Sequence, residues 1–353
     1  MARKVRVGVN GYGVIGKRVA DAVRAQTDMV LVGVSDVATD WRTLVLSRKG
    51  VPLYAANTAA QEDMQAAGAH VAGRLDDLLG SVDVVVDCTP KRIAAANVTI
   101  YRERGLKFIV QGGEKHDVTG HSFVAEANYE SALGRAATRV VSCNTTGTVR
   151  TLTALKRAGL LRRARGTLLR RATDPWESHK GGVMNTMVPE PEIPSHQGPD
   201  AQTVDPDLDV LTMAVKVPET IAHLHYWAVQ LARPTSKEEV LEAFEASSRI
   251  ILMKDVYGLE ALNSVKELMA DSGRSRGDLY EVALWSDMLR VQGDELFYAY
   301  MVDNQAIVIP ETVDAIRALT GQEPVGSRSI ARTNAALGIG GRLFSNSDGA
   351  ATT

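Results

Sequence analysis

Short apolar runs alternate with helical patterns over the first 142 residues of the chain. Five runs rich in β-branched residues lack polar alternation, at positions 5–9, 30–34, 82–87, 107–111 and 139–142. Runs of this kind are typical of strands buried on both faces of a parallel sheet. An amphipathic pattern over residues 15–24 predicts a helix directly after the first strand. The alternation therefore predicts a doubly wound α/β domain.

The rest of the chain has a different pattern, with longer strands and an α+β character. Strand patterns cover residues 166–171, 211–217, 222–231 and 295–302, and helical patterns cover residues 236–247, 259–272, 310–319 and 327–337. We expect a second domain with a mainly antiparallel sheet at residues 143–324. The first domain is expected to span residues 1–142, with a C-terminal helix at about 325–340 packing back on it.

Composition narrows the class of protein. The length of 353 residues suits two domains, and a formal net charge of −2 gives no general attraction to nucleic acid or anionic membrane. No apolar run is long enough to span a membrane, and the N-terminus lacks a signal-peptide pattern. The two cysteines cannot form a disulfide framework, and no cluster has metal-ligand spacing. We expect a cytoplasmic protein with no metal site.

A Gly-x-Gly-x-x-Gly motif is formed by Gly11, Gly13 and Gly16, between the first predicted strand and the first predicted helix. This is the context in which the motif binds a dinucleotide. Gly11 permits the tight turn, Gly13 lets the backbone approach a pyrophosphate, and Gly16 lets the helix pack closely on the strand. The helix N-terminus offers N–H groups to the phosphates. We therefore predict an N-terminal Rossmann domain, with a plain glycine turn as the alternative.

Asp36 stands at the end of the second predicted strand, twenty residues after Gly16. A carboxylate at this position binds the adenine-ribose hydroxyls of NAD and repels the 2′-phosphate of NADP. The alternative is an aspartate that only starts a turn. The sequence favours NAD and leaves NADP open.

Cys143 lies where a predicted strand ends in a polar cluster and a helical pattern begins. A helix N-terminus lowers the pKa of a thiol and makes it a better nucleophile near neutral pH, so we expect a lowered pKa here. Polar groups on Ser142 and Asn144 are available to cap the helix and to place a substrate. The alternative of a buried small hydrophobe fits Cys88 better, because Cys88 follows an apolar run.

A reactive thiol needs a partner that handles protons, and the chain offers seven histidines. His223 and His225 follow a strand pattern and would point to the same face of that strand. Spacing alone does not choose between these two. For each of them the alternative is an ordinary core or surface histidine.

Several motifs together resemble the archaeal-type (second class) glyceraldehyde-3-phosphate dehydrogenases over nearly the whole chain. The matching segments lie at residues 10–20 (NGYGVIGKRVA), 111–115 (QGGEK), 142–147 (SCNTTG), 170–175 (RRATDP), 194–200 (PSHQGPD) and 273–276 (GRSR). They occur in the family's order and approximate spacing. The resemblance is more specific than any one of these motifs.

The resemblance implies a role for each matching residue. Cys143 matches the nucleophile and His223 the catalytic base. The matching cofactor contacts are Val14, Ile15, Gly112, Arg171 and Asn304. The matching substrate or phosphate contacts are Ser142, Asn144, Arg170, His196 and Gln197.

Three positions depart from the family pattern. The family has two adjacent histidines where this chain has His196 and Gln197, and Asn304 stands where the family has a glutamine near the nicotinamide. Many members have lysine where Asp36 stands. A lysine would accept a 2′-phosphate, so this exchange also favours NAD.

The resemblance implies the reversible phosphorylating oxidation of D-glyceraldehyde 3-phosphate to 1,3-bisphosphoglycerate. The reaction proceeds through a thiohemiacetal and a thioester on Cys143, with hydride transfer to NAD(P) and attack by inorganic phosphate. A homotetramer is also implied. Two rival hypotheses remain: a sister reductase acting on a semialdehyde or acyl phosphate through a thioester, and a non-catalytic nucleotide-binding regulatory protein.

Overall fold

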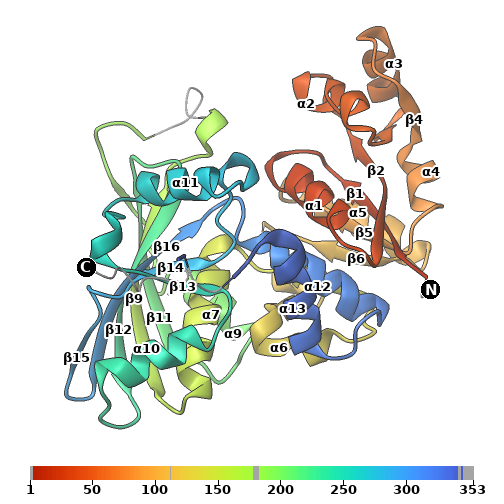
Figure 1. The fold of residues 1–353 in the computed structure, drawn as a ribbon. Helices are drawn as coiled ribbons and strands as arrows, with labels where there is room; N and C mark the ends of the chain where they lie inside the picture. Colours follow the sequence, from red (N-terminus) through yellow and green to blue (C-terminus); the bar gives the residue numbers. More distant parts are fainter. Residues whose placement is uncertain (1–2, 112, 178–182, 341–342, 345–353) are drawn as a thin grey trace, which may run out of the picture. The chain divides into compact units, whose positions relative to one another are not determined.

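The computed structural model describes residues 3–111, 113–177, 183–340 and 343–344. The chain separates into two compact units. The first contains the described residues up to Ser142 together with Val308–Leu337, and the second contains those of Cys143–Ile307 and those from Gly338 onward. Figure 1 shows the elements of each unit.

The first unit is built on an eight-stranded sheet in which every described pair of strands is parallel. The strands lie in the order β4-β3-β2-β1-β5-β6-β8-β7. Their bounds are β1 Val5–Asn10, β2 Met29–Asp36, β3 Leu53–Ala55, β4 Val71–Arg74, β5 Val84–Asp87, β6 Lys107–Val110, β7 Ser122–Phe123 and β8 Ala137–Val140. This confirms the predicted parallel α/β domain, and the five strands predicted from apolar runs are all present with shifted ends.

Helices connect and cover these strands. They are α1 Val14–Arg24, α2 Trp41–Leu44, α3 Thr58–Ala66, α4 Leu75–Leu79, α5 Ile93–Glu103, α6 Ala125–Asn128, α12 Val308–Thr320 and α13 Gly326–Leu337. Helix α5 packs Val98 against Val85 of β5 and Phe108 of β6 in one buried cluster. Full burial of one apolar side chain of this size stabilises the fold by about 1.5–3 kcal/mol.

The second unit is built on a mixed sheet rather than a sheet of one kind. Its strands lie in the order β10-β11-β9-β12-β16-β14-β13, with β15 beside β16. The pairs β11–β9 and β13–β14 are parallel, and the other described pairs are antiparallel. The bounds are β9 Leu161–Arg171, β10 Val188–Pro189, β11 Val210–Val217, β12 Ala222–Leu231, β13 Ile250–Met253, β14 Val282–Trp285, β15 Arg290–Gln292 and β16 Glu295–Asp303.

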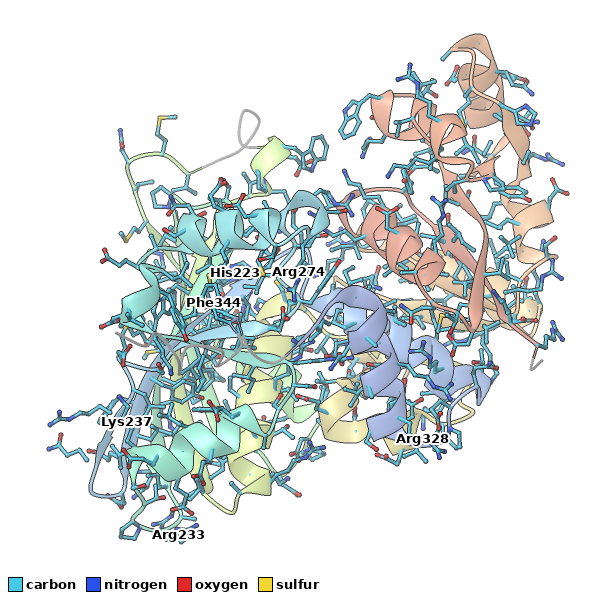
Figure 2. The ribbon with its side chains drawn as sticks, viewed as in Figure 1. His223, Arg233, Lys237, Arg274, Arg328 and Phe344 are labelled. Atoms are coloured by element: carbon cyan, nitrogen blue, oxygen red, sulfur yellow. The ribbon has the colours of Figure 1, made fainter. Side chains whose placement is uncertain are left out.

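One face of this sheet is covered by helix α7, Cys143–Arg157, which contacts β9 and β16. The other helices of the unit are α9 Gln197–Gln202, α10 Lys237–Glu245 and α11 Leu262–Asp271. In Figure 2 the labelled Lys237 marks the start of α10, and His223 lies within β12. The short strands β13 and β14 were missed by the sequence analysis, because a buried run of four apolar residues carries no periodicity.

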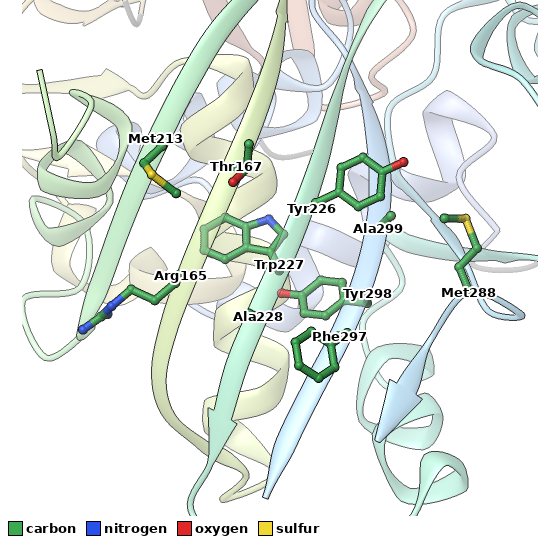
Figure 3. Close-up of a pocket in the computed structure, with 10 residues that line it drawn as sticks. All are labelled: Arg165, Thr167, Met213, Tyr226, Trp227, Ala228, Met288, Phe297, Tyr298 and Ala299. Atoms are coloured by element: carbon green, nitrogen blue, oxygen red, sulfur yellow. The ribbon is translucent and has the colours of Figure 1, made fainter. Parts of the chain in front are cut away.

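The other face of the sheet presents apolar side chains to solvent. Tyr226 on β12, Met213 on β11 and Phe297 on β16 are 44%, 41% and 37% exposed. They border a shallow hollow that is drawn in Figure 3, with Met288 on its rim. Contiguous exposed apolar surface of this kind is unusual unless something covers it.

The expected domain boundary at residue 324 was placed too late in the chain. Helix α12 belongs to the first unit, where it contacts α1, β6 and β8 and is buried over nearly its whole length. The helix expected at 325–340 ends at Leu337, and the chain from Gly338 onward belongs to the second unit. A helix buried on all sides gives no amphipathic stripe from which to infer the sheet that it packs against.

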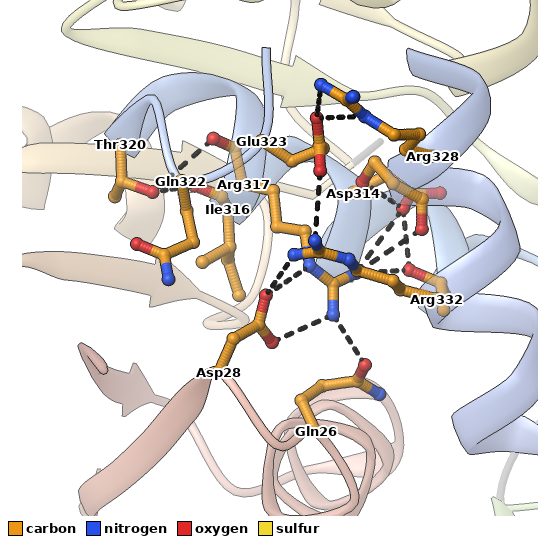
Figure 4. Close-up of polar contacts among 12 residues, drawn as sticks. Gln26, Asp28, Asp314, Ile316, Arg317, Thr320, Gln322, Glu323, Arg328 and Arg332 are labelled. Carbon is orange, nitrogen blue, oxygen red and sulfur yellow. Dashed lines mark hydrogen bonds and ion pairs between the residues drawn. The ribbon is translucent and has the colours of Figure 1, made fainter. Parts of the chain in front are cut away.

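Arg317 on α12 joins the C-terminal helices to the loop between α1 and β2 (Figure 4). Its guanidinium donates hydrogen bonds to both carboxylate oxygens of Asp28 at 2.8 and 2.9 Å, to Gln26 at 2.7 Å and to Thr333 of α13 at 2.6 Å. The Arg317 side chain is 1% exposed. Although burial acts to raise the pKa of Asp28, its hydrogen bond to Arg317 and the charge of that residue give a net lowering.

We expect Arg317→Met to destabilise the first unit by about 3–5 kcal/mol, because it removes both Arg317 hydrogen bonds from the Asp28 carboxylate, whose side chain is only 13% exposed. Arg332→Met is a matched control on α13, since Arg332 is 52% exposed and lies 3.8 Å from the same carboxylate. The control should cost at most about 1 kcal/mol. Urea unfolding followed by circular dichroism measures both.

The difference between Arg317→Met and the wild-type protein should shrink at acid pH. A carboxylate with a lowered folded-state pKa contributes stability above its unfolded pKa and loses it as pH falls through the folded value. Equal losses in the two variants at neutral pH would contradict the role given to Arg317.

Candidate functional site

The glycine-rich turn of the first unit has the geometry that the motif requires. Gly11 has a φ of +93°, and a Cβ atom there would lie 2.8 Å from the carbonyl carbon of Cys88. A Cβ atom on Gly16 would lie 1.8 Å from the carbonyl oxygen of Gly11. No other residue fits at either position without moving the backbone.

Gly13 differs from these two glycines because nothing described lies within 4 Å of where its Cβ would be. It is the N-cap residue of α1, and no side chain caps that helix. The half-buried Val14 and Ile15 follow as the first residues of α1. An open approach to backbone N–H groups at a helix N-terminus is suited to the phosphates of a dinucleotide.

Asp36 ends β2 beside this turn, as the sequence analysis expected. One of its carboxylate oxygens accepts a hydrogen bond from the Tyr12 N–H at 2.6 Å, and the other accepts one from the Ala38 N–H at 2.7 Å. The carboxylate therefore starts the turn that follows β2, and its bond to Tyr12 also stabilises the glycine-rich turn. Gly112, matched to a cofactor contact, lies outside the described residues.

Cys143 is the first residue of α7, which confirms the expected position at a helix N-terminus. Its Sγ atom lies 3.1 Å from Nε2 of His223 on β12. The other ring nitrogen of His223, Nδ1, accepts a hydrogen bond from the backbone N–H of Arg171 at 3.0 Å. A nitrogen that accepts carries no proton, so the proton of the neutral ring is on Nε2 and faces the sulfur.

Burial, followed by the charges of His225, Arg171 and Arg170, holds the pKa of His223 well below its ordinary value. The ring is therefore neutral near pH 7. An imidazolium would also turn an N–H group on Nδ1 against the Arg171 N–H. Geometry and charge both favour the neutral form with its proton on Nε2.

The expected lowering of the Cys143 pKa is wrong for the protein without ligands. Burial raises the pKa of this thiol and outweighs the opposing effects of the Arg171 charge, the Asn144 backbone N–H and the Arg170 charge. Asp303 acts in the same direction as burial. The sequence showed the helix N-terminus but could not show how tertiary packing surrounds the thiol of Cys143, a residue that is itself half-buried.

Gly147 allows α7 to lie tightly against β16. A Cβ atom at this position would be 2.6 Å from Cγ1 of Val302 and 3.2 Å from the ring of Tyr300. The close approach fixes the height of Cys143 and Asn144 above the sheet. The glycine of the cysteine motif therefore has a packing role.

His225 occupies a different place from His223. Its Nε2 atom lies 2.8 Å from Oδ1 of Asn144, and its Nδ1 atom lies 2.8 Å from the hydroxyl of Tyr300. Of the two histidines that spacing left open, His223 is the one that contacts the sulfur. Ser142, half-buried, directly precedes Cys143 at the end of the first unit.

Arg170 and Arg171 end β9 close to Cys143. Arg170 forms an ion pair with Glu190, whose carboxylate also lies 3.8 Å from Nδ1 of His196. Arg171 lies 3.4 Å from the carboxylate of Asp174. The sequence analysis gave no role to Glu190, which stands in no recognisable pattern, or to Asp174, which lies in the matching segment 170–175.

Two amide side chains have unsatisfied atoms. Gln197, the first residue of α9, is 0% exposed, and within the described part of the chain neither its Oε1 nor its Nε2 has a hydrogen-bond partner. Asn304 donates to Asp174 at 3.0 Å, while its buried Oδ1 has no partner among the described residues. Leaving such groups unpaired costs about 1–3 kcal/mol each, so a ligand or water that bonds them is favoured.

Comparison with known proteins identifies the family. Residues 142–287 match the family model described as glyceraldehyde 3-phosphate dehydrogenase, C-terminal domain. Residues 5–113 match the model described as dihydrodipicolinate reductase, N-terminus. The chain is 45% identical over 336 residues to a glyceraldehyde-3-phosphate dehydrogenase of Pyrococcus abyssi, covering 95% of this chain and 99% of the relative.

The chain belongs to the glyceraldehyde-3-phosphate dehydrogenase family. Identity to the enzyme of Thermococcus kodakarensis is 44% over 336 residues, 95% of this chain and 99% of the relative. Identity to that of Methanobrevibacter smithii is 42% over 335 residues, 94% and 99% of the two chains. The resemblance to the archaeal-type dehydrogenases is confirmed, and the family supports the use of NAD(P).

Further observations concern an ion pair within the second unit, metal-binding groups and membrane-spanning helices. Arg274, in the last of the family motifs, forms a paired ion contact with Glu281 at 2.5 and 2.6 Å and bonds the Gly338 carbonyl, so it holds the fold of the second unit. No group of three or more potential ligands is arranged to hold a metal ion within the described residues. Nor is any helix of the described chain long and apolar enough to cross a membrane.

Proposed function

We propose that this chain catalyses the reversible phosphorylating oxidation of D-glyceraldehyde 3-phosphate to 1,3-bisphosphoglycerate, with NAD(P) as hydride acceptor. The observation that carries the proposal is Cys143 at the N-terminus of α7, with His223 Nε2 3.1 Å from its sulfur. Relatives at 42–45% identity that are named for this dehydrogenase support it. The first unit would bind the dinucleotide and the second would carry the reacting thiol.

The sulfur of Cys143 forms a bond to the aldehyde carbon, and the electron pair of the C=O bond moves to the oxygen. When bound, NAD(P) supplies the acceptor for the hydride that leaves this carbon. The C=O bond then reforms as a thioester. Inorganic phosphate attacks the thioester carbon, and the Cys143 thiolate leaves as the acyl phosphate forms.

We propose that His223 acts as a hydrogen-bond donor rather than as a base. Its Nε2 already carries the ring proton, because Nδ1 accepts from the Arg171 N–H. That Nε2–H group can stabilise the thiolate and then the oxygen of the thiohemiacetal, where negative charge develops. The thiol proton passes to solvent before addition, so turnover should rise with pH.

Substrate and inorganic phosphate need cationic and amide donors near the sulfur. Arg170 is a proposed phosphate ligand because its Nε has no partner among the described residues, although Glu190 holds the other end of its guanidinium. Gln197 is the second proposed contact, because its buried amide has no hydrogen-bond partner in the described part of the chain. Ser142, Asn144 and His196 complete the proposed substrate contacts.

For the cofactor we propose NAD over NADP. Asp36 places a carboxylate beside the glycine-rich turn, and a 2′-phosphate near it would meet a like charge. Gly11, Gly13, Val14, Ile15 and Gly16 are the proposed phosphate-binding backbone. Arg171 and Asn304 are further proposed cofactor contacts, since the unpaired Oδ1 of Asn304 can accept from a carboxamide.

We propose further that the chain forms a homotetramer, in which the apolar face of its second sheet makes one of the contacts between copies. Tyr226, Met213 and Phe297 expose a contiguous apolar surface there. A second copy of the same surface would bury it in a symmetric contact.

The function is tested with purified protein, glyceraldehyde 3-phosphate and NAD, following reduced nicotinamide by absorbance. We expect turnover that requires inorganic phosphate and that Cys143→Ser reduces by more than about 10³-fold, because the serine hydroxyl is a far weaker nucleophile. Cys88→Ser is the control and should retain wild-type turnover. No turnover with either cofactor would overturn the function, and a panel of semialdehydes and acyl phosphates would then test the sister reductases.

Cofactor choice is tested with Asp36→Asn in the same assay. We expect wild-type kcat/KM to be higher with NAD, and the variant to gain at least about tenfold in kcat/KM with NADP relative to NAD, because a like charge is removed. The amide keeps an acceptor for the glycine-rich turn. A wild-type preference for NADP would contradict the role of Asp36 without affecting the reaction.

Assembly is tested by sedimentation velocity. We expect four times the mass of one chain, and a smaller species for Phe297→Asp, because a charge would be buried in the contact. Val256→Asp is the control, since Val256 is 84% exposed and lies outside the sheet. A tetramer that withstands Phe297→Asp would place the contact elsewhere.

A further inference from the structure

The reaction proposed above leaves the second histidine of the pair without a role. His225 lies two residues after His223 on β12 and is fully buried. Register places it directly opposite Tyr300 of β16. Its ring is held between the Tyr300 hydroxyl on Nδ1 and the Asn144 side chain on Nε2, each at 2.8 Å.

These two contacts determine where the His225 proton lies. The atom of Asn144 that faces Nε2 is Oδ1, an amide oxygen that can only accept, so Nε2 must carry the proton. Burial, and then the charge of Arg170, lower the pKa of His225 to about 3, which leaves the ring one proton at neutral pH. Nδ1 is therefore bare and accepts from the Tyr300 hydroxyl.

The orientation of the Asn144 amide follows from this arrangement. With Oδ1 turned to His225, the Nδ2 group is left at 4.0 Å from the Cys143 sulfur. If the amide turned over, its oxygen would face the thiolate or the adduct oxygen, both of which are negative. The same side chain would then oppose the charge that it now stabilises.

We propose that His225 is a positioning residue: held by the Tyr300 hydroxyl, it fixes the Asn144 amide so that its N–H groups face the sulfur of Cys143 and the oxygen of the substrate adduct. The inference rests on the proposed function. The adduct oxygen is two bonds from the sulfur, so a donor close to the sulfur is also within reach of that oxygen. Asn144 on α7 and His223 on β12 would then each supply a hydrogen-bond donor to the adduct oxygen.

The residues that support this arrangement are closely packed. Asn144, His225 and Tyr300 are all buried, and Gly147 brings α7 against the rings of β16. Each hydrogen bond from Tyr300 through His225 to Asn144 joins one donor to one acceptor. Loss of the Tyr300 hydroxyl should therefore change the orientation of the Asn144 amide.

The first test is Tyr300→Phe, which removes only the hydroxyl. The His225 proton is then free to move to Nδ1, and the Asn144 amide is free to turn. We expect kcat to fall at least about tenfold while KM changes less than about twofold, because the lost interaction acts in the transition state. Tyr298→Phe is the matched control on the same strand, since the Tyr298 hydroxyl is not a partner of His225, and it should stay near wild type.

A double-mutant cycle separates positioning from a general packing role. Asn144→Ala and His225→Leu should each lower kcat, and the double variant should be no slower than the worse single variant. His225→Gln should recover part of the loss, because its amide keeps a donor near the position of Nε2. If His225→Leu does not fold, the cycle is run with Tyr300→Phe in its place.

A second readout does not depend on turnover. Alkylation of Cys143 by iodoacetamide, measured against pH in a Cys88→Ser background, reports the thiol pKa, which Arg170, Arg171, His223 and Asp303 also influence. We expect Tyr300→Phe to move the midpoint upward and Tyr298→Phe to leave it unchanged. This measurement applies even if the wild-type protein lacks the proposed dehydrogenase activity. A failure of the proposed function can therefore be distinguished from a failure of the role given to His225.

The inference would be overturned by either of two results. One is a Tyr300→Phe variant with wild-type kcat and an unmoved alkylation midpoint. The other is a double variant whose loss equals the product of the two single losses, which would mean that His225 acts independently of Asn144.

Discussion

The hydrogen bond from the Arg171 backbone N–H to Nδ1 of His223 constrains the chemistry of the second unit. It spans two neighbouring strands, β9 and β12, and so depends on the sheet rather than on a side chain that could swing away. Because one ring nitrogen accepts, the other must donate, and the donor faces the sulfur of Cys143 at 3.1 Å. The tautomer of the histidine is set by the backbone, and a side-chain substitution at Arg171 would leave that N–H in place.

Burial and the neighbouring positive charges act in opposite directions on the pKa of the Cys143 thiol. Burial raises the Cys143 pKa, and the neighbouring arginines lower it without prevailing in the protein alone. A buried environment also strengthens every hydrogen bond to charge that develops during the reaction. The site therefore stabilises a thiolate less than a helix N-terminus by itself would, while its donors are placed for an anionic adduct.

The first unit depends on different forces. Its glycine-rich turn is fixed by steric exclusion at Gly11 and Gly16, while Gly13 keeps the helix N-terminus open. Its C-terminal helices are attached through Arg317, which neutralises Asp28 and satisfies Gln26 and Thr333 together. The polar network adds directional hydrogen bonds to the apolar packing of α12, which stabilises the contact without fixing its direction.

The sequence by itself determined the two-domain organisation, the parallel sheet of the first unit, the family and the position of Cys143 at the start of a helix. The domain organisation, the sheet and the position of Cys143 follow from local patterns: apolar runs, glycine spacing and a polar cluster after a strand. The family follows from the resemblance of several motifs that occur in its order. Tertiary structure alone decided that α12 packs on the first unit, that His223 rather than His225 contacts the sulfur, and that the thiol pKa is raised. It also decided that Asn144 is held by His225 and Tyr300. Each of these depends on burial or on contacts between residues distant in the sequence, such as Arg171 with His223, and neither spacing nor periodicity contains that information.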